Sequence, residues 1–152
     1  MTYDRGGEFG FAGQDDIAAM LKDDSLPASG TLLCLRRHVP AWWDRVAQAR
    51  SGLALELVPI PPSLDPECSD RLRVLWTSAL PYMARPVLVF CKEGRHRTGM
   101  VAALSALAGG ASLRSAIATY VQRTAGEPRE REISIIRALA PLAHLHGGSD
   151  VP

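Results

Sequence analysis

The stretch from residue 86 to residue 104, PVLVFCKEGRHRTGMVAAL, constrains the fold of this chain more than any other. Its first part, Val87 to Phe90, is a short apolar run of the kind that forms a buried strand. A loop follows from Cys91 to Arg97, and a helix is expected to open at Thr98. The sequence therefore predicts a strand, a short loop and a helix, with a cysteine at the carboxyl end of the strand.

The predicted loop is suited to hold a negative charge. Successive backbone N–H groups of a loop curled around one point form an anion-binding nest, and the helix dipole adds its positive end there. Gly94 and Gly99 permit backbone conformations and close approaches that a side chain would hinder. We therefore expect Cys91 to be a thiolate nucleophile at neutral pH. The same nest would hold a phosphate, and Arg97 adds a planar fork that binds two phosphate oxygens.

The pattern Cys-x5-Arg-Thr-Gly, formed by Cys91, Arg97, Thr98 and Gly99, resembles the signature loop of the cysteine-dependent protein tyrosine and dual-specificity phosphatases. In 152 residues with three cysteines and thirteen glycines, chance places this pattern rarely, and the predicted strand and helix supply its structural context. The resemblance implies that Cys91 accepts the phosphate and that Arg97 binds it. Thr98 matches the hydroxyl that helps the thiolate leave in the second step.

Length and composition favour one globular domain spanning residues 1–152. The contents of 47% hydrophobic and 22% charged residues are ordinary for such a domain. The net charge of +1 provides no overall field that attracts nucleic acid, so we expect no nucleic-acid partner. The oligomeric state stays open.

The sequence also favours a cytoplasmic protein. The N-terminus, MTYDRGGEFG, has no apolar targeting segment, and no apolar run is long enough to predict an integral membrane segment. Three cysteines, an odd number without metal-ligand spacing, argue against a disulfide scaffold or a zinc site. A reducing cytoplasm fits these features best.

Predicted strands and helices alternate along the chain. Strands are expected over residues 8–11, 31–35, 53–60 and 87–90. Helices are expected over residues 17–22, from Pro40 to Ala47, from Ser69 or Asp70 to Leu80, from Thr98, over 112–124 and over 128–145, with a disordered tail at 147–152. The alternation predicts an α/β fold with a mostly parallel central sheet flanked by helices on both faces, which the resemblance also implies. Ligands of such sheets bind at the carboxyl ends of the strands, where Cys91 lies.

The acid that protonates the leaving group is less clear. In the family, an aspartate on a mobile loop before the cysteine does this and then accepts a proton from the hydrolytic water. Residues 59–67, PIPPSLDPE, stand in that place, and Asp65 is the candidate acid, 26 residues before Cys91. Glu67 and Asp70 are the alternatives. Asp65 could instead cap a turn before Pro66, and Asp70 could be a helix N-cap. The loop departs from the family's Trp-Pro-Asp pattern, so the acid's identity stays open.

The residues inside the loop are expected to bind the substrate and set its class. They are Lys92, Glu93, Gly94, Arg95, His96 and Arg97. Lys92 and Arg95 stand where the phosphatase-and-tensin lipid phosphatases carry lysines, CKxGKxRTG. The segment also resembles fungal and plant atypical phosphatases that act on inositol pyrophosphates. Two cations at the rim favour a polyanionic substrate. Alternatively, they are solvated and offset nearby acids such as Glu93.

These features predict a phosphatase that acts on phosphate monoesters through a phosphocysteine. The expected partner is a phosphorylated protein (phosphotyrosine, phosphoserine or phosphothreonine) or a phosphoinositide or inositol phosphate. No metal or cofactor is required, because the loop itself supplies the positive field. The alternative is a catalytically silent phosphate-binding module of the same fold. The unusual acid loop favours that alternative, whereas the intact Cys91, Arg97 and Thr98 weigh against it.

Cys34 supports a second hypothesis. It lies in TLLCLRRH, a run expected to form the strand beside the Cys91 strand, and the lipid phosphatases carry a cysteine in a similar run, LCxxRH. A reactive thiolate near a second thiol can be oxidised to a reversible disulfide, so Cys34 is a candidate regulatory partner of Cys91. The alternative is that Cys34 is a small buried hydrophobe.

Overall fold

The strand that ends at Cys91 lies in the middle of the sheet. In the computed structural model, which describes residues 2–4, 9–61 and 65–148, this strand is β5 (Val87–Cys91), and all five of its residues are buried. A strand covered on both faces needs apolar side chains pointing both ways, which explains its continuous apolar run.

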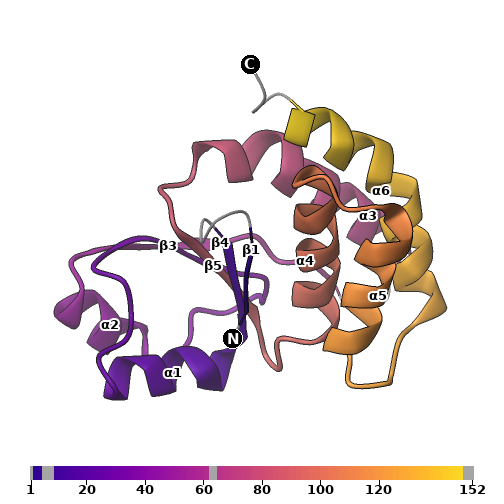
Figure 1. Cartoon of the computed structure of the whole chain (residues 1–152). Coiled ribbons are helices and arrows are strands. Elements are labelled where there is room, and N and C mark those ends of the chain that lie inside the picture. The colour runs from indigo at the N-terminus through magenta and orange to yellow at the C-terminus, as the bar shows by residue number, and fades with distance from the viewer. Residues whose placement is uncertain (1, 5–8, 62–64, 149–152) are drawn as a thin grey trace.

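The described strands form one sheet in the order β1-β2-β5-β3-β4 (Figure 1). The strands β2 (Phe9–Gly13), β5, β3 (Ser29–Cys34) and β4 (Gly52–Leu57) run parallel. The short strand β1 (Thr2–Asp4) pairs antiparallel with β2. The predicted α/β fold with a mostly parallel central sheet is therefore confirmed, with an antiparallel edge strand that the sequence analysis did not include.

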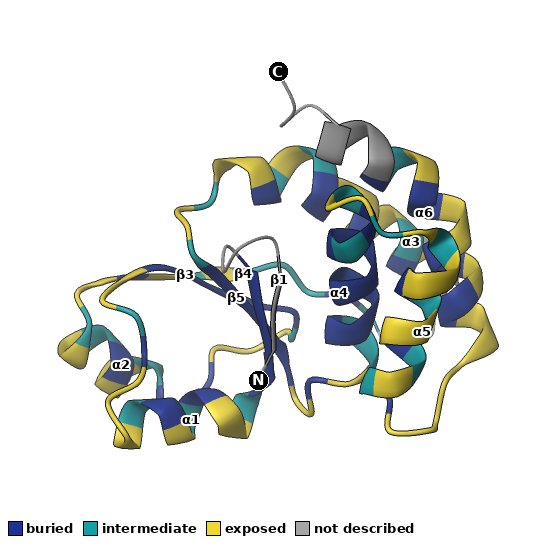
Figure 2. Cartoon of the chain, viewed as in Figure 1, coloured by how far each residue is buried: buried dark blue, intermediate teal, exposed yellow. Residues whose placement is uncertain are grey.

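The described helices cover both faces of the sheet (Figure 1). On one face lie α1 (Gln14–Lys22) and α2 (Trp43–Ala49). The other face carries α3 (Asp65–Val74), a π-helical turn (Leu75–Ala79), a 3-10 turn (Leu80–Tyr82), α4 (His96–Ala108), α5 (Leu113–Arg123) and α6 (Glu130–Gly148). The helix α4, which follows the loop of Cys91, is buried along most of its length between the sheet and the other helices (Figure 2).

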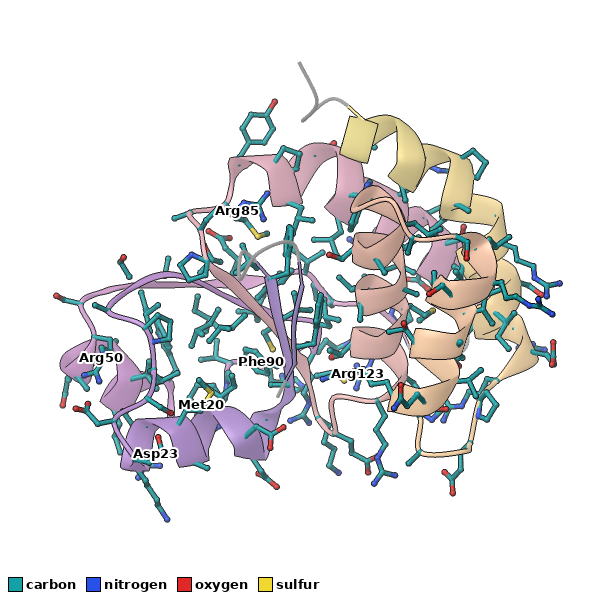
Figure 3. All side chains as sticks on the ribbon, in the orientation of Figure 1. Met20, Asp23, Arg50, Arg85, Phe90 and Arg123 are labelled. Carbon is teal, nitrogen blue, oxygen red and sulfur yellow. The ribbon has the colours of Figure 1, made fainter. Side chains whose placement is uncertain are left out.

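Alternating side chains of β5 divide the core into two apolar clusters. Val87 and Val89 pack in the larger cluster with α3, α4, α5 and α6. Leu88 and Phe90 pack in the smaller cluster with α1 and α2, where Figure 3 shows Phe90 and Met20. Since successive side chains of a strand point to opposite faces, β5 joins the two layers and holds the loop at their boundary.

Several expected boundaries differ from the structure. The helix expected from Pro40 is α2, which begins at Trp43. The helix expected to begin at Ser69 or Asp70 is α3, which begins at Asp65, so Asp70 lies inside the helix and is not its N-cap. The expected strand over 53–60 ends at Leu57. The helix α6 continues to Gly148, and residues 149–152 of the expected tail lie outside the described residues.

Among the residues that the structure describes, no helix combines the length and the apolar character that crossing a bilayer would require.

Candidate active site

The loop from Cys91 to Arg97 turns back so that its own donors face the cysteine. The Gly94 N–H group donates to Cys91 Sγ at 3.3 Å, and the Thr98 hydroxyl donates to the same sulfur at 3.0 Å. Cys91 is 3% exposed, and Thr98 is buried at the start of α4. Two donors that converge on one sulfur stabilise its negative charge, so the arrangement suits a nucleophilic thiolate.

The junction between β2 and α1 supports the loop from below. The Gln14 N–H group donates to the Lys92 carbonyl oxygen at 3.1 Å. Gly94 has φ +74°, and a Cβ there would lie 2.5 Å from the carbonyl carbon of Ala12 and the nitrogen of Gly13. A side chain at Gly94 would therefore meet both a strained backbone conformation and a steric clash with backbone that cannot move aside.

Arg123 ties α5 to the same loop. Its Nε donates to the Gly94 carbonyl oxygen at 2.7 Å, and its guanidinium lies 5.7 Å from the centre of the Phe11 ring. Figure 3 shows Arg123 between α5 and the sheet. Burial lowers the pKa of Arg123, while the nearby charges of Cys91 and Asp16 raise it. A partly buried guanidinium close to Cys91 adds to the positive field around the sulfur.

A buried carboxylate on α6 holds the far side of the loop. Glu132 is 1% exposed, and its Oε1 lies 2.8 Å from His96 Nδ1. The Tyr120 hydroxyl donates to the same oxygen. The pKa of Tyr120 is raised, mainly because the hydroxyl is buried and also because of this hydrogen bond. The second oxygen of Glu132 lies 3.7 Å from Arg129 Nη1. The Arg129 N–H group donates to the Tyr120 hydroxyl oxygen at 3.0 Å, so α5 and α6 are joined to His96 through one network.

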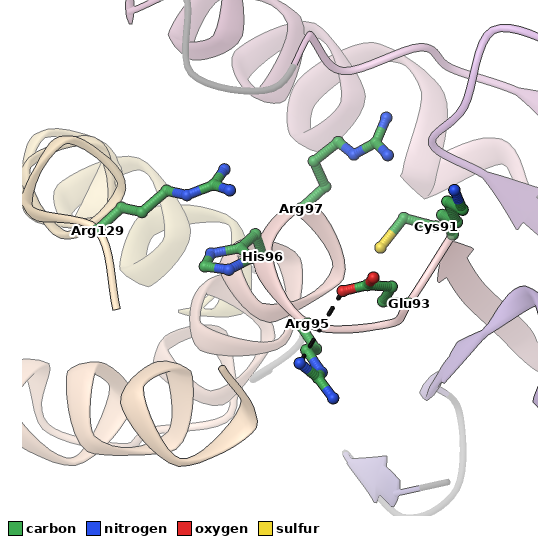
Figure 4. A pocket seen from close by; sticks show the side chains of 7 residues that line it. Cys91, Glu93, Arg95, His96, Arg97 and Arg129 are labelled. Carbon is green, nitrogen blue, oxygen red and sulfur yellow. Dashed lines mark ion pairs between the residues drawn. The ribbon is translucent and has the colours of Figure 1, made fainter. Parts of the chain in front are cut away.

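The loop and Arg129 line a pocket of about 150 Å³ above the sulfur (Figure 4). Its described lining is Cys91, Lys92, Glu93, Arg95, His96, Arg97 and Arg129. Five residues of the expected substrate-binding set thus line the pocket, and Gly94 lies buried beneath them. Arg129, which was not expected from the sequence, reaches in from the position just before α6. The pocket carries more cations than anions and therefore suits an anionic ligand.

One of the cations at the rim of the pocket lies near an acid of the same loop, as expected if the rim cations offset nearby acids such as Glu93. Arg95 Nη1 lies 4.0 Å from Glu93 Oε2, and both side chains are largely exposed (Figure 4). Such an exposed pair contributes little to stability and can open easily for a ligand.

Arg97 lies between this pocket and a second one. Its Nη1 lies 3.5 Å from the carbonyl oxygens of Leu35 and Ile60, at the long limit for a hydrogen bond. Both carbonyls belong to residues that line a neighbouring pocket of about 420 Å³, to which Arg97 also contributes. The weak contacts leave its guanidinium able to turn toward a phosphate above Cys91.

The three candidate acids, Asp65, Glu67 and Asp70, differ in their positions relative to the two pockets. Asp65 is the first residue of α3, and its side chain lies outside the described part. Glu67 is exposed and lines the second pocket together with Arg97. Asp70 is exposed inside α3 and is absent from the described lining of both pockets. Position therefore favours the beginning of α3 over Asp70 for the acid.

Cys34 lies next to the Cys91 strand, as expected, but its side chain packs elsewhere. It pairs with Phe90 across β3 and β5 and belongs to the smaller core cluster, whereas Cys91 belongs to the larger one. Both thiols are free. Cys34 Sγ lies 3.9 Å and 3.8 Å from the carbonyl oxygens of Arg36 and His38, and burial raises the pKa of the Cys34 thiol. A disulfide between Cys34 and Cys91 would require the two side chains to leave separate clusters.

Comparison with known proteins identifies the fold. No family model and no curated protein matches the chain. The core catalytic domain of the PP-IP phosphatase Siw14 from S. cerevisiae, solved with citrate, is similar in structure: the TM-score is 0.66 at 16% identity, over 100% of this chain and 98% of that one. The chain has the dual-specificity phosphatase fold.

Two further structures support this assignment. PTPMT1 matches with a TM-score of 0.64 at 14% identity, over 97% of this chain and 99% of that one. Human DUSP28 matches with a TM-score of 0.52 at 17% identity, over 91% of this chain and 94% of that one. The fold and the superfamily resemblance carried by the loop motif therefore agree.

Proposed function

We propose that this protein hydrolyses phosphate monoesters through a phosphocysteine formed on Cys91. The observation that carries the proposal is the pair of donors on Cys91 Sγ, Gly94 N–H and the Thr98 hydroxyl, beneath a cationic pocket. The fold supports it, since the solved structures that the chain resembles include a domain described as a catalytic phosphatase core.

In the first step, the Cys91 thiolate attacks phosphorus while Arg97 and the loop N–H groups bind the non-bridging oxygens. An S–P bond forms and the P–O bond to the leaving group breaks. The departing alkoxide or phenoxide takes a proton from an acid, for which Asp65 is our candidate and Glu67 the alternative.

In the second step, water attacks the phosphocysteine. The water gives up a proton to the same acid residue, now a carboxylate, and the S–P bond breaks. The Thr98 hydroxyl, 3.0 Å from Cys91 Sγ, stabilises the departing thiolate. Both steps require a reduced sulfur, so the proposal includes a reducing location such as the cytoplasm.

For the substrate class, we favour a phosphorylated small molecule or lipid head group over a phosphoprotein. Lys92, Arg95, Arg97 and Arg129 surround the pocket, and Glu93 is the one carboxylate in its described lining. Several cations favour a ligand that carries more charge than a single phosphate. The Siw14 domain is described as a PP-IP phosphatase, and PTPMT1 was solved in complex with PI(5)P.

The second candidate function is a silent phosphate-binding module. The acid loop favours it, because the loop departs from the family's Trp-Pro-Asp pattern. Such a module would bind phosphate in the Cys91 pocket without turnover.

Release of phosphate from an aryl phosphate, in the presence of a metal chelator, tests the proposal. We expect turnover by the reduced wild-type protein and a loss of about 10⁴-fold or more in Cys91→Ser, since the nucleophile is removed. Cys34→Ser serves as the matched cysteine control and should retain activity. Phosphate binding without turnover in the wild type would favour the silent module.

The same assay distinguishes the acids. Asp65→Asn should slow phenyl phosphate hydrolysis more than nitrophenyl phosphate hydrolysis, because the better leaving group needs less protonation. If Glu67→Gln has that effect instead, Glu67 is the acid.

A further inference from the structure

The second pocket, beside the Cys91 pocket, contains two arginines, Arg37 and Arg71, that the proposed chemistry does not use. Its volume is about 420 Å³, and it shares Arg97 with the Cys91 pocket. The charged residues of its described lining are three arginines, Arg37, Arg71 and Arg97, and one carboxylate, Glu67. The remaining described lining is apolar. Three guanidinium groups against one carboxylate leave a positive excess inside a hollow.

Two of these arginines have no partner of their own among the described residues. Arg37 follows β3, and Arg71 lies on α3, so two distant segments bring them to the same hollow. Neither forms a hydrogen bond or an ion pair with another described residue. Both side chains are exposed, so water screens part of their charge, but a bound anion could still interact favourably with both guanidinium groups.

The position of Arg97 links the two pockets. Its Nη1 lies near the carbonyl oxygens of Leu35 and Ile60, which line the second pocket, while the residue also lines the Cys91 pocket. A molecule held at the sulfur would therefore have a second cationic hollow directly beside it. The partly buried rings of Pro59 and Pro61, which also line the second pocket, would face the part of the molecule between its charged groups.

We propose that Arg37 and Arg71 form a second phosphate subsite, so that the preferred substrate is a small molecule bearing two phosphate groups. The inference rests on the proposed function of the Cys91 pocket. Guanidinium forks bind phosphate oxygens in pairs, and two of them suit a phosphate dianion better than one carboxylate. One phosphate lies above Cys91 for hydrolysis, and the second binds to Arg37 and Arg71. Glu67 limits the positive charge of the subsite without cancelling it.

The test compares linear diol bisphosphates of increasing chain length with the alkyl monophosphates of the same lengths. Each is used as a competitive inhibitor of aryl phosphate hydrolysis. At the best chain length, the bisphosphate should inhibit the wild type at least about tenfold more strongly than the monophosphate, since it gains charged hydrogen bonds. Arg37→Ala and Arg71→Ala should each remove most of that advantage, and their effect on the monophosphate should be much smaller.

Arg73→Ala is the matched control. Arg73 is exposed on the same helix, two positions from Arg71, and is absent from the described lining of the pocket. The Arg73→Ala variant should still be inhibited more strongly by bisphosphates than by monophosphates. The subsite is contradicted if mono- and bisphosphates inhibit equally, or if Arg37→Ala and Arg71→Ala weaken both to the same degree. The subsite is also contradicted if these variants weaken inhibition by an acidic phosphotyrosine peptide but leave the stronger inhibition by bisphosphates unchanged.

The failure of the subsite and the failure of the proposed function can be separated. Binding of the same compounds is also measured by calorimetry, which needs no turnover. An inactive protein that still prefers bisphosphates in an Arg71-dependent manner would contradict the phosphatase proposal and support the subsite. An active protein that binds mono- and bisphosphates equally would support the phosphatase proposal and contradict the subsite.

Discussion

At the scale of single residues, the two neighbouring cysteines have opposite environments. Cys91 Sγ accepts hydrogen bonds from Gly94 and Thr98, whereas Cys34 lies in an apolar cluster and burial raises the pKa of its thiol. A raised pKa means less thiolate at a given pH, and thiolate is the reactive form. We therefore expect Cys34 to be the less reactive of the two thiols.

We predict that iodoacetamide at neutral pH modifies Cys91 at least about tenfold faster than Cys34. Modification of Cys34 should increase as the pH rises above the ordinary range of thiols, because more of it ionises. Mass spectrometry of the digested protein measures both sites, and inorganic phosphate should protect Cys91 alone. Equal rates, or a Cys34–Cys91 linked peptide after mild peroxide, would show that the two thiols are not held apart.

The sequence was sufficient for residues whose roles depend on local geometry. Cys91, Gly94, Arg97 and Thr98 belong to one short loop, so their spacing alone predicted that they would gather around an anion. Arg129 was not predictable in this way, because it enters the pocket through the packing of α6 against α4. A single sequence does not state which distant residues meet.

At the scale of secondary-structure elements, α6 acts on the loop through Glu132 and His96. The carboxylate is buried and also accepts a hydrogen bond from Tyr120 on α5. Glu132 is absent from the described lining of the Cys91 pocket, so we propose that it positions the loop and takes no direct part in the reaction. Its effect should depend on His96.

We predict that Glu132→Gln lowers kcat for an aryl phosphate about tenfold with a smaller change in KM, and destabilises the fold by about 2 kcal/mol. The physical reason is that the amide loses the charge that holds His96 and Tyr120. In a double-mutant cycle with His96→Gln, the losses in kcat should not add. The control is Glu130→Gln, an exposed carboxylate at the start of the same helix. Additive losses would mean that Glu132 acts on stability alone.

The beginning of α3 shows why one element was misplaced from sequence. The prolines at 59, 61, 62 and 66 favoured a non-helical loop up to Ser69. However, Pro66 lies in the first turn of α3, where the missing N–H group would have no helical partner. A proline there is compatible with a helix, so α3 begins at Asp65 and brings Arg71 to the second pocket.

At the scale of the whole molecule, the fold places the loop where two layers meet. The parallel strands β2 and β5 end side by side, with Gly13 paired to Cys91, and the helices α1 and α4 begin just beyond them. The alternating strand and helix pattern was enough to predict this arrangement. The edge strand β1 could not be predicted in this way, because a run of three residues is too short to show the alternation of apolar and polar side chains that indicates a strand.

The most direct test of the account is to trap the covalent intermediate. The reduced protein is mixed with an aryl phosphate, quenched in acid within one turnover and digested for mass spectrometry. We predict one added phosphate on the peptide that contains Cys91, which is absent in Cys91→Ser and accumulates in Thr98→Ala, where the thiolate leaves more slowly. Turnover with no phosphate on Cys91, or phosphate on another residue, would contradict the phosphocysteine mechanism.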